Sequence, residues 1–394
     1  MALSADTVWE VRTDGDDGNG GGFVTGASGT DYSQQAAAQK SAADLTMHAT
    51  TDTKCHPGAL GVAAADVGNI IHISAGTDWT PGWYEIKSQD GTDWTLDRSP
   101  SEAGNANLAT FKLGGGIATF ATLASVSVGG NVANIRYGTY TAGATVDFST
   151  KTVRIIGHKS GTNRPVLKAT ANDITLLLGR STTASVRAME FDGDTYTGVT
   201  GCDYGYGNDR RGLAYDCVAR NCAVGFASKT ACYYCCAAYD CETGFGLTRA
   251  NFCYAESCTT AGFIGTSVFC IANACAIGFK HSSGGTFSTN CIAYGSTGNG
   301  FKAYATSRGD GFVYCIAVNS GGYGFASMNI SSAAYCAGYN NTSGHIDTIS
   351  AERNIGFITL SADPFVDAAG GDFNLNDTEG GGALLRAIGL SLEL

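Results

Sequence analysis

The stretch CVARNCAVGF, residues 217–226, carries the pattern that decides the fold. It places two cysteines five residues apart and follows the second one with a Gly-Phe pair. Copies of this pattern recur along the chain at steps of 17 to 24 residues. Repeats of this length are typical of solenoid proteins, in which each copy forms one coil and stacks on the next.

The cysteines of the repeat fall into two columns when the copies are aligned. The first column holds Cys217, Cys236, Cys253, Cys270, Cys291, Cys315 and Cys336, and the second holds Cys222, Cys241, Cys258 and Cys275. In the later copies Ser296, Ser320 and Asn341 take the second position. A packing position tolerates such replacements and a metal ligand does not, so we interpret the columns as small buried side chains.

The residues between the two cysteines predict how each coil is built. Cys217 and Ala219 lie two residues apart and therefore point to the same side of a strand. Asn221 tolerates the backbone angles of a bend, which turns Cys222 back inward. In every copy the residue at the Ala219 position is Ala or Gly, so the core there must be narrow. The sequence predicts an all-β protein, a right-handed parallel β-helix, because neither a leucine-rich pattern nor a hexapeptide period is present.

Composition supports many short strands and excludes several classes of partner. The 394 residues include 55 glycines and 5 prolines, and 15% of the residues are charged. The net charge of −11 argues against binding to nucleic acid or to an anionic membrane. No apolar run is long enough to span a membrane, and the N-terminus lacks the pattern of a signal peptide. We therefore expect a protein made in the cytoplasm that binds neither nucleic acid nor membrane.

Three stretches resemble the pectate-lyase-like superfamily of right-handed parallel β-helices. They are FATLASVSVGGNVANIRYGTYTAGATVDF (residues 120–148), VRIIGH (153–158) and DPFVDAAGGDFNL (363–375). The resemblance implies a first coil, the strand that follows it and a closing coil. This superfamily includes lyases, hydrolases, adhesins and viral spikes, so the resemblance implies a fold and leaves the activity open.

The first part of the chain resembles the opening segments of β-helix proteins encoded by tailed bacteriophages. The stretches are TVWEVRTDGDDGNGGGF (7–23), DYSQQAAAQ (31–39) and GNIIHISAGTDWTPGWYEIKSQDGTDWTLDRS (68–99), of which the last alternates like strands. We expect a β-rich attachment or capping region over 1–113, the β-helix over 114–350 and a closing coil and cap over 351–394. The resemblance implies a location on the virion, other virion proteins as partners and a threefold homo-oligomer.

Two features could bind metal, and each has a simpler interpretation. The cysteines could hold zinc or form disulfides, and Cys232 and Cys235 form a C-x2-C pair. Parallel side chains on neighbouring rungs lie too far apart for good disulfide geometry, so we expect free thiols. The loop DGDDGNGGG (14–22) could bind calcium, but a solvated turn explains it as well. We assign no catalytic residue, no cofactor and no metal ligand.

Two charged loops are candidates for contacts with a glycan. One contains Asp209, Arg210 and Arg211, and the other contains Arg308 and Asp310. Solvated loop tips are the alternative. Polysaccharide cleavage would need paired carboxylates, or an Arg or Lys base with an acidic metal site. No column of the repeat stacks acidic residues at corresponding positions on neighbouring rungs.

An apolar stripe accompanies the cysteine columns. The residue after the first cysteine points outward if the cysteine points inward, and it is apolar in most copies; we predict an interface at Val218, Tyr254, Ile271, Ile292 and Ile316. Self-association is one explanation, and cover by a loop or by the C-terminal segment is the other.

The sequence as a whole predicts a non-enzymatic structural protein of a phage particle. Such a spike, fibre or surface decoration would contact host-surface polysaccharide. The alternative is a polysaccharide lyase or glycoside hydrolase on the same scaffold, and a cellular adhesin is disfavoured by the missing signal peptide.

Overall fold

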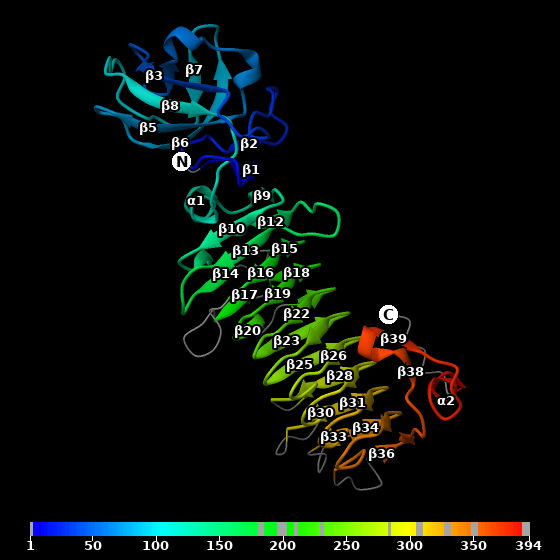
Figure 1. The fold of residues 1–394 in the computed structure, drawn as a ribbon. Coiled ribbons are helices and arrows are strands. Elements are labelled where there is room, and N and C mark those ends of the chain that lie inside the picture. The colour runs from blue at the N-terminus through cyan, green and yellow to red at the C-terminus, as the bar shows by residue number, and fades with distance from the viewer. Residues whose placement is uncertain are drawn as a thin grey trace. The chain divides into compact units, whose positions relative to one another are not determined.

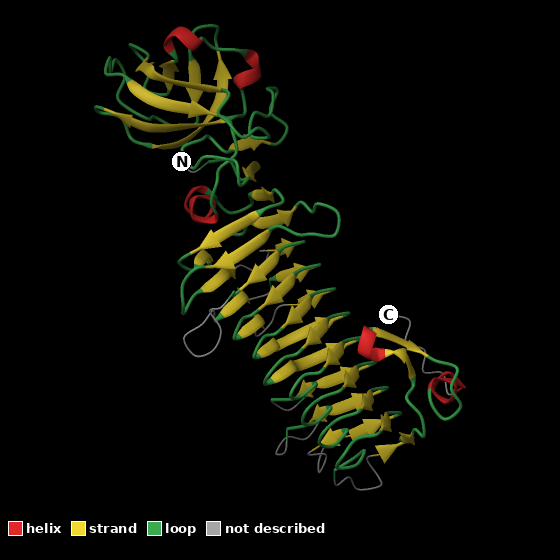
Figure 2. Ribbon diagram, in the orientation of Figure 1, coloured by secondary structure: helices red, strands yellow, loops and turns green. Residues whose placement is uncertain are grey.

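The computed structural model describes residues 3–179, 185–194, 203–208, 212–228, 232–282, 285–304, 310–326, 332–347 and 354–387. The chain forms two compact units. The first comprises residues 1–142, 146–167 and 180–189, and the second comprises 143–145, 168–179 and 190–394. Strands dominate both units, and the helices are short (Figure 2). The described part of the chain contains no helix that is long and apolar enough to cross a membrane.

A small antiparallel barrel forms one end of the first unit (Figure 1). Its strands run in the order β3 (Lys40–Met47), β4 (Lys54–His56), β7 (Trp94–Leu96), β6 (Gly82–Gln89), β5 (Ile70–Gly76) and β8 (Ala109–Leu113), and η1 (Gly58–Leu60) and η2 (Ala64–Asp66) lie between strands. The strands expected from the alternation over 68–99 are β5, β6 and β7.

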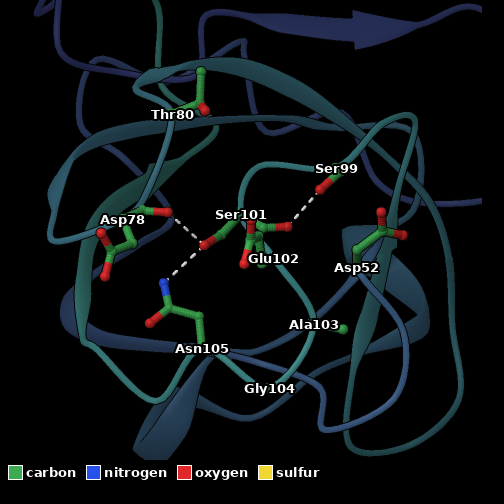
Figure 3. Close-up of a pocket in the computed structure, with 9 residues that line it drawn as sticks. All are labelled: Asp52, Asp78, Thr80, Ser99, Ser101, Glu102, Ala103, Gly104 and Asn105. Atoms are coloured by element: carbon green, nitrogen blue, oxygen red, sulfur yellow. Dashed lines mark hydrogen bonds between the residues drawn. The ribbon is translucent and has the colours of Figure 1, made fainter.

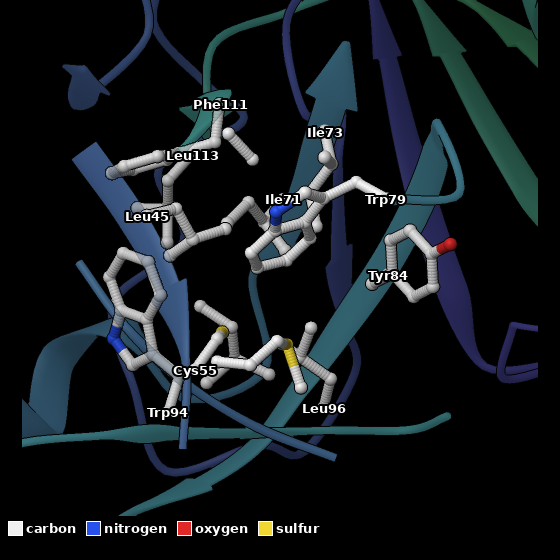
Figure 4. Close-up of a cluster of buried hydrophobic side chains, with 13 residues drawn as sticks. Leu45, Cys55, Ile71, Ile73, Trp79, Tyr84, Trp94, Leu96, Phe111 and Leu113 are labelled. Carbon is white, nitrogen blue, oxygen red and sulfur yellow. The ribbon is translucent and has the colours of Figure 1, made fainter. Parts of the chain in front are cut away.

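Apolar side chains from all sides of this barrel meet in one cluster (Figure 4). Trp94 packs edge-on against Phe111 with ring centroids 5.5 Å apart. The indole nitrogen of Trp94 donates a hydrogen bond of 2.9 Å to Asp66, so the polar edge of the buried ring is satisfied.

The first strand of the chain belongs to a coil and precedes the barrel in sequence. β1 (Thr7–Val11) pairs in parallel with β9 (Val132–Ile135), which pairs with β12 (Arg154–Gly157), and β12 pairs with β15 (Ser185–Arg187). β2 (Gly22–Val24) pairs with β1 in the antiparallel sense. The chain also forms β10 (Thr139–Ala142), β11 (Val146–Phe148) and β13 (Val166–Ala169). The barrel is therefore inserted between β1 and the rest of its coil.

The FATL segment begins a short helix, α1 (Phe120–Val126). Thr119 caps the helix, because its hydroxyl accepts a hydrogen bond from the backbone N–H of Thr122. Asp17 in turn accepts hydrogen bonds from the backbone N–H groups of Ala118 and Thr119. Phe120, Leu123 and Val126 lie on the buried side.

The second unit is a parallel β-helix with three short strands in each coil. We call the three faces sheets I, II and III. Sheet I contains β14 (Thr175–Gly179), β17 (Tyr204–Asn208), β20 (Val224–Ser228), β27 (Phe279–Lys280), β30 (Phe301–Lys302) and β33 (Phe325–Ala326). Sheet II contains β18 (Leu213–Tyr215), β21 (Cys232–Tyr234), β28 (Phe287–Thr289), β31 (Gly311–Val313), β34 (Ser332–Ala334) and β36 (Asn354–Ile355). The longer β23 (Thr243–Asn251) and β25 (Ala261–Val268) pass through both sheets.

Sheet III lies on the third side of each coil, and its strands pair in parallel in chain order. They are β16 (Glu190–Asp192), β19 (Val218–Arg220), β22 (Ala237–Tyr239), β24 (Tyr254–Glu256), β26 (Ile271–Asn273), β29 (Ile292–Tyr294), β32 (Ile316–Val318), β35 (Ala337–Tyr339) and β37 (Ile358–Thr359). The right-handed parallel β-helix that the repeat predicts is therefore confirmed.

Two corners of each coil are single residues in the left-handed conformation, which costs a residue with a Cβ atom about 1–2 kcal/mol. Corner 2 leads from sheet III to sheet I and holds Asn221, Asp240, Ser257, Ala274, Gly295, Asn319 and Asn340, with φ between 47° and 61°. Corner 1 leads from sheet II to sheet III and holds Asp216, Cys235, Phe252, Phe269, Asn290, Tyr314 and Tyr335, with φ between 51° and 55°. The sequence predicted the bend at corner 2. It gave no turn signal for corner 1, because aromatic residues occupy that position in several copies.

A close approach between sheets I and III sets the width of the coil. The glycine before each phenylalanine of sheet I faces the alanines of sheet III. A Cβ atom on Gly244 would lie 2.7 Å from the carbonyl oxygen of Gly262 and 3.2 Å from the Cβ atoms of Ala238 and Ala255. Beside this contact the phenylalanines stack along the axis with centroids 4.8–5.0 Å apart; they are Phe226, Phe245, Phe263, Phe279, Phe301 and Phe325.

The cysteines of both columns lie inside the coils directly after the corners. All eleven predicted members are buried, with exposed fractions of 0–2%, and all eleven are free thiols. Each thiol can donate across its corner. The Sγ atom of Cys270 lies 3.3 Å from the carbonyl oxygen of Val268 and 3.4 Å from that of Ala250 on the preceding rung, and these two oxygens share its single proton. Burial raises the pKa of Cys236 and Cys291, which keeps these thiols protonated and unreactive.

The C-terminal segment differs from the closing coil that the resemblance implied. β36 and β37 belong to the last coil, but residues 363–375 form an antiparallel hairpin of β38 (Phe365–Asp367) and β39 (Asp372–Leu375), joined by η4 (Ala368–Gly370). Gly371 makes the reversal possible with φ of 87°. The helix α2 (Gly382–Ala387) follows.

The close approach between sheets I and III yields a direct prediction. We expect Gly278→Ala to lower the unfolding temperature, because the new Cβ atom would lie 2.6 Å from the carbonyl oxygen of Gly300 and 2.8 Å from the Cβ atom of Ala293. Overpacking of this kind costs about 1–3 kcal/mol. The matched control is Gly143→Ala, whose Cβ atom would meet its nearest neighbour at 3.4 Å. Equal melting temperatures for the two variants in thermal unfolding would contradict the account.

Candidate functional site

The outward face of sheet III is covered at one end by the C-terminal segment. Phe365 and Phe373 of the hairpin pack on Tyr294 with ring centroids 6.2 and 5.9 Å away. The same apolar cluster contains Ile292 and Ile316, which are fully buried. Figure 1 shows the hairpin and α2 beside the stacked strands of the second unit. The cover leaves the outer face of β16, β19 and β22 outside this cluster.

The expected exposure of the apolar stripe is therefore wrong at three of its five positions. Ile292 and Ile316 are buried because the C-terminal segment packs on them. Val218 is 5% exposed, and Tyr254 and Ile271 are half-buried. Cover by the C-terminal segment, the second explanation of the stripe, accounts for the residues in the cluster.

A row of polar side chains continues along sheet III beyond the cover. Strand pairing places Asp192, Arg220, Tyr239 and Glu256 at the same position on successive rungs, and Glu190 lies beside Asp192 on the same side of β16. We call these five residues the polar row. All of them are half-buried, so each presents part of its side chain at the surface.

Arg220 is held between its neighbours in the polar row. Its Nε donates a hydrogen bond of 3.1 Å to Glu190 on the preceding rung. Its guanidinium carbon lies 4.3 Å from the centre of the Tyr239 ring on the next rung, a cation–π contact. The ion pair and the ring contact fix the guanidinium group, while 39% of the side chain stays exposed.

The remaining polar groups of the face are also positioned by hydrogen bonds. Asn273 donates to the Tyr254 hydroxyl at 3.1 Å and to Glu256 at 3.3 Å. Asp192 accepts a hydrogen bond of 2.9 Å from the Asn221 side chain. Burial raises the pKa of the Tyr254 hydroxyl, so this group remains a donor at neutral pH. The face offers carboxylate, guanidinium, amide and phenol groups in fixed positions.

Three acidic residues alternate in the stretch EFDGD, residues 190–194, and the sequence analysis did not single them out. Glu190 and Asp192 point to the outer side of β16. The Asp194 carboxylate forms an ion pair with the Lys168 ammonium group, with the two atoms 3.1 Å apart. The repeat is hard to recognise here because Met189 and Phe191 stand where later copies have cysteine and alanine. The alternation of acids with an apolar residue in a strand was the available signal.

Of the five residues predicted to contact a glycan, the structure describes Asp310 alone. Asp310 is buried, at 2% exposed, so its assignment to a loop tip is wrong. Its carboxylate accepts hydrogen bonds from the backbone N–H of Thr286 at 3.1 Å and of Tyr304 at 3.3 Å, which explains the burial of the charge. Asp209, Arg210, Arg211 and Arg308 lie outside the described residues.

A buried cluster inside the second unit combines the side chains of Ser288, His281 and Asp310. His281 Nε2 lies 3.1 Å from the Ser288 hydroxyl, and His281 Nδ1 lies 3.8 Å from the Asp310 carboxylate. The imidazole stacks on Phe312 with centroids 4.5 Å apart. Serine, histidine and aspartate form the catalytic triad of hydrolases, but Ser288 is fully buried and no substrate reaches it. We interpret this cluster as structural.

The acidic loop over 14–22 uses its carboxylates within the chain. Asp14 pairs with Arg12 at 2.7 Å and Asp16 pairs with Lys112 at 2.6 Å, while Asp17 caps the segment before α1. These contacts account for the acidic residues without a calcium ion. Over the described residues, no group of three or more His, Cys, Asp or Glu side chains is arranged to hold a metal.

The barrel carries a polar pocket of about 680 Å³ (Figure 3). It is lined by Asp52, Asp78, Thr80, Ser99, Ser101, Glu102, Ala103, Gly104 and Asn105. The lining groups bind one another: the Ser101 hydroxyl donates to the backbone oxygen of Asp78 at 2.6 Å and accepts from Asn105 at 2.7 Å. Acidic and hydroxyl groups dominate, and none of the lining side chains is aromatic or basic.

Known structures resemble this chain in fold. Neither a protein-family model nor a curated protein matches it. The A-module of the Azotobacter vinelandii mannuronan C-5 epimerase AlgE6 aligns at 13% identity over 62% of this chain and 94% of its own, with a TM-score of 0.41. A rhamnogalacturonan lyase aligns at 15% identity over 64% and 86%, with a TM-score of 0.44. Tailspike protein 2 of bacteriophage CBA120 aligns over its enzymatically active domain at 10% identity, 75% and 50% coverage and a TM-score of 0.36.

The parallel β-helix of this chain is shown by its own strand pairing, and it agrees with the fold that the sequence stretches indicated. Identities of 10–15% relate these proteins by fold alone.

The buried histidine predicts how stability depends on pH. Burial lowers the pKa of His281 to about 4, whereas the unfolded value is about 6.5. Between these two pH values the unfolded chain binds more protons than the folded chain. The contribution of neutral His281 to the free energy of unfolding is therefore fully present above about pH 6.5 and is lost as the pH falls towards about 4. We expect His281→Gln, whose side chain does not titrate, to lose less stability than the wild type between neutral pH and about pH 4.5.

Thermal unfolding followed at several pH values measures this difference. His48→Gln is the control, since the His48 side chain is 37% exposed, and it should follow the wild type. A wild-type pH dependence in His281→Gln would show that another group is responsible.

Proposed function

We propose that the polar row binds an extended polysaccharide along the axis of the β-helix. The observation that carries the proposal is the placement of Asp192, Arg220, Tyr239 and Glu256 on successive rungs of sheet III. The first three lie on β16, β19 and β22, outside the C-terminal cover, and Glu256 lies at its edge. Solenoids use such long, regular surfaces to bind extended partners. Rungs repeat every ~4.8 Å, close to the length of one pyranose unit, so one rung can meet one sugar.

The chemistry of the row suits a neutral or mixed-charge glycan. Carboxylates accept hydrogen bonds from sugar hydroxyls and a guanidinium group donates to them. The face carries the carboxylates of Glu190, Asp192, Asp194 and Glu256 and the cations Lys168 and Arg220. A strongly anionic polysaccharide would meet this acidic surface on a chain of net charge −11, which opposes its binding.

The second part of the proposal is the setting, the surface of a phage particle. It is supported by the resemblance of residues 7–23, 31–39 and 68–99 to the opening segments of phage β-helix proteins. In this setting the N-terminal region would attach to the particle and the β-helix would contact the glycan of the host surface. Labelling of purified particles with an antibody against this chain tests the setting; particles without the chain would refute it.

The first test concerns binding. We expect Arg220→Ala to weaken binding to the preferred polysaccharide at least tenfold, about 1.4 kcal/mol, because it removes a positioned donor and releases Glu190 and Tyr239. Affinity electrophoresis against a panel of neutral and anionic polysaccharides selects the ligand, and calorimetry measures the affinity. Arg98→Ala is a matched control, since Arg98 pairs with Asp97 and lies 4.1 Å from the centre of the Tyr84 ring in the barrel. Equal losses in both variants would contradict the proposal.

Glycosidic cleavage is the second candidate, and the acids of β16 favour it. Glu190 and Asp192 are alternate residues on one side of a strand, so their Cα atoms lie about 6.6 Å apart. An inverting glycosidase needs two carboxyl groups on the same face, one acting as acid and the other as base for water. Arg220 beside Glu190 would hold one carboxylate in place. A hydrolase on this face would use the same bound glycan.

The second test separates cleavage from binding. If the face is a hydrolase, the wild type will release new reducing ends from the bound polysaccharide, and Asp192→Asn will lower that rate at least a hundredfold while its affinity changes less than threefold. Glu256→Gln, three rungs away, is the control and should keep the rate. Absence of new reducing ends and of unsaturated ends with every bound polysaccharide would leave binding as the function.

A further inference from the structure

The outward side of sheet II and the adjoining corner 1 form an apolar surface that the proposed function does not use. We call it the aromatic face. Its large exposed members are Leu213, Tyr215, Tyr234, Phe252, Phe287, Tyr314, Tyr335 and Ile355, each between 38% and 56% exposed. They recur on most rungs of the second unit, so the exposed apolar side chains follow the helix axis.

The aromatic residues of corner 1 stand where the backbone opposes them. Phe252, Phe269, Tyr314 and Tyr335 adopt φ values of 53–54°, a conformation that bulky residues rarely occupy. Asp216 and Asn290 occupy the same corner on other rungs, so residues suited to the conformation fit there. Strained residues persist where structure or function requires them.

Packing inside the molecule does not explain the choice of aromatic residues at corner 1. Phe252 stacks on Phe269 with centroids 5.1 Å apart, and Tyr314 stacks on Tyr335 with centroids 5.3 Å apart. In each pair, a single stacking contact must offset the backbone strain of two residues. Phe252 nevertheless stays 53% exposed and Tyr335 47% exposed. Stacking among the described residues therefore leaves both rings about half exposed and available for contact with another molecule.

Charge identifies the kind of partner. Among the described residues of the sheet II strands and corner 1, only Arg249 and Asp216 are charged. A chain with a net charge of −11 repels its own copies over most of its surface. On the aromatic face two copies can meet without like charges in contact. A highly charged partner would find only Arg249 and Asp216 to pair with here.

The exposed area is that of a stable interface. Aromatic and large aliphatic side chains of this type present about 150–250 Å² each, so eight half-exposed ones offer about 800 Å². A specific protein–protein interface buries about 800 Å² on each partner. Exposed apolar patches of this size are rare on monomers.

We propose that the aromatic face packs against the aromatic face of a second copy of this chain. On sheet III, where the sequence placed the interface, Tyr254, Ile271, Ile292 and Ile316 belong to the cluster that the C-terminal segment of the same chain covers. We therefore place the interface between copies on sheet II. An interface there leaves the polar row of sheet III accessible to a ligand. This inference stands independently of the glycan-binding proposal.

The test removes the aromatic rings without harming the fold. In Phe252→Asn/Tyr335→Asn, asparagine matches Asn290 at the same corner and tolerates the left-handed conformation. We expect the full-length wild type to form a dimer or larger assembly at micromolar concentration in analytical ultracentrifugation. The double variant should have a dissociation constant raised at least tenfold and a thermal stability, measured at a concentration where both are monomers, that is equal or higher.

The control is Val366→Asn, which removes a side chain that is 57% exposed on the C-terminal hairpin; it should associate as the wild type does. A second readout uses Cys235, an exposed thiol of corner 1. Its maleimide labelling, followed by peptide mass spectrometry, should slow as the wild-type concentration rises. A wild type that stays monomeric at about 100 μM, well above the micromolar range of stable complexes, would overturn the proposal. So would a double variant that associates like the wild type, or assembly with another protein only.

Discussion

The close approach of sheets I and III is the constraint on which the β-helix depends. Glycines in sheet I lie so near to the alanines of sheet III that a Cβ atom on Gly225 would stand 2.8 Å from the carbonyl oxygen of Gly244. This contact leaves room along sheet I for one column of large side chains, the stacked phenylalanines. On some rungs a buried ring of sheet II, such as Tyr233 or Phe312, packs against them. Small thiols fill the space next to the corners, where their S–H groups satisfy backbone oxygens. Cysteine thus suits these positions because its side chain is small and its S–H group can donate a weak hydrogen bond to a backbone oxygen.

Because side chains fill the narrow coil, a ligand or partner of the β-helix must bind to its outer surface. Sheet III carries an apolar part, which the C-terminal hairpin covers, and a polar part on β16, β19 and β22, which it does not. Sheet II carries aromatic residues at its corner, including Phe252 and Tyr335 in the left-handed conformation. One chain therefore presents a surface suited to hydroxyl-rich ligands and a separate surface suited to its own copies.

The repeat predicts the fold well because packing restricts the inner positions. Alanine or glycine at the Ala219 position and a turn former at the Asn221 position follow from the narrow core and from corner 2. Outer positions carry no such restriction, so the polar row was missed: Met189 and Phe191 hide the repeat on the rung that holds Glu190 and Asp192. The burial of Ile292 and Ile316 was predicted only as an alternative, because a segment more than forty residues away in sequence covers them. The sequence placed Asp310 at a loop tip. Hydrogen bonds from the backbone N–H groups of Thr286 and Tyr304 and from the Thr286 hydroxyl explain its burial.

An experimental structure of the chain with an oligosaccharide of its preferred polysaccharide tests the central claim most directly. The account predicts sugar rings running along sheet III beside the C-terminal hairpin, with hydroxyl groups bonded to Arg220, Asp192 and Glu256. Sugar found in the polar pocket of the barrel, around Ser101 and Asn105, with the outer face of β19 and β22 unoccupied, would contradict it.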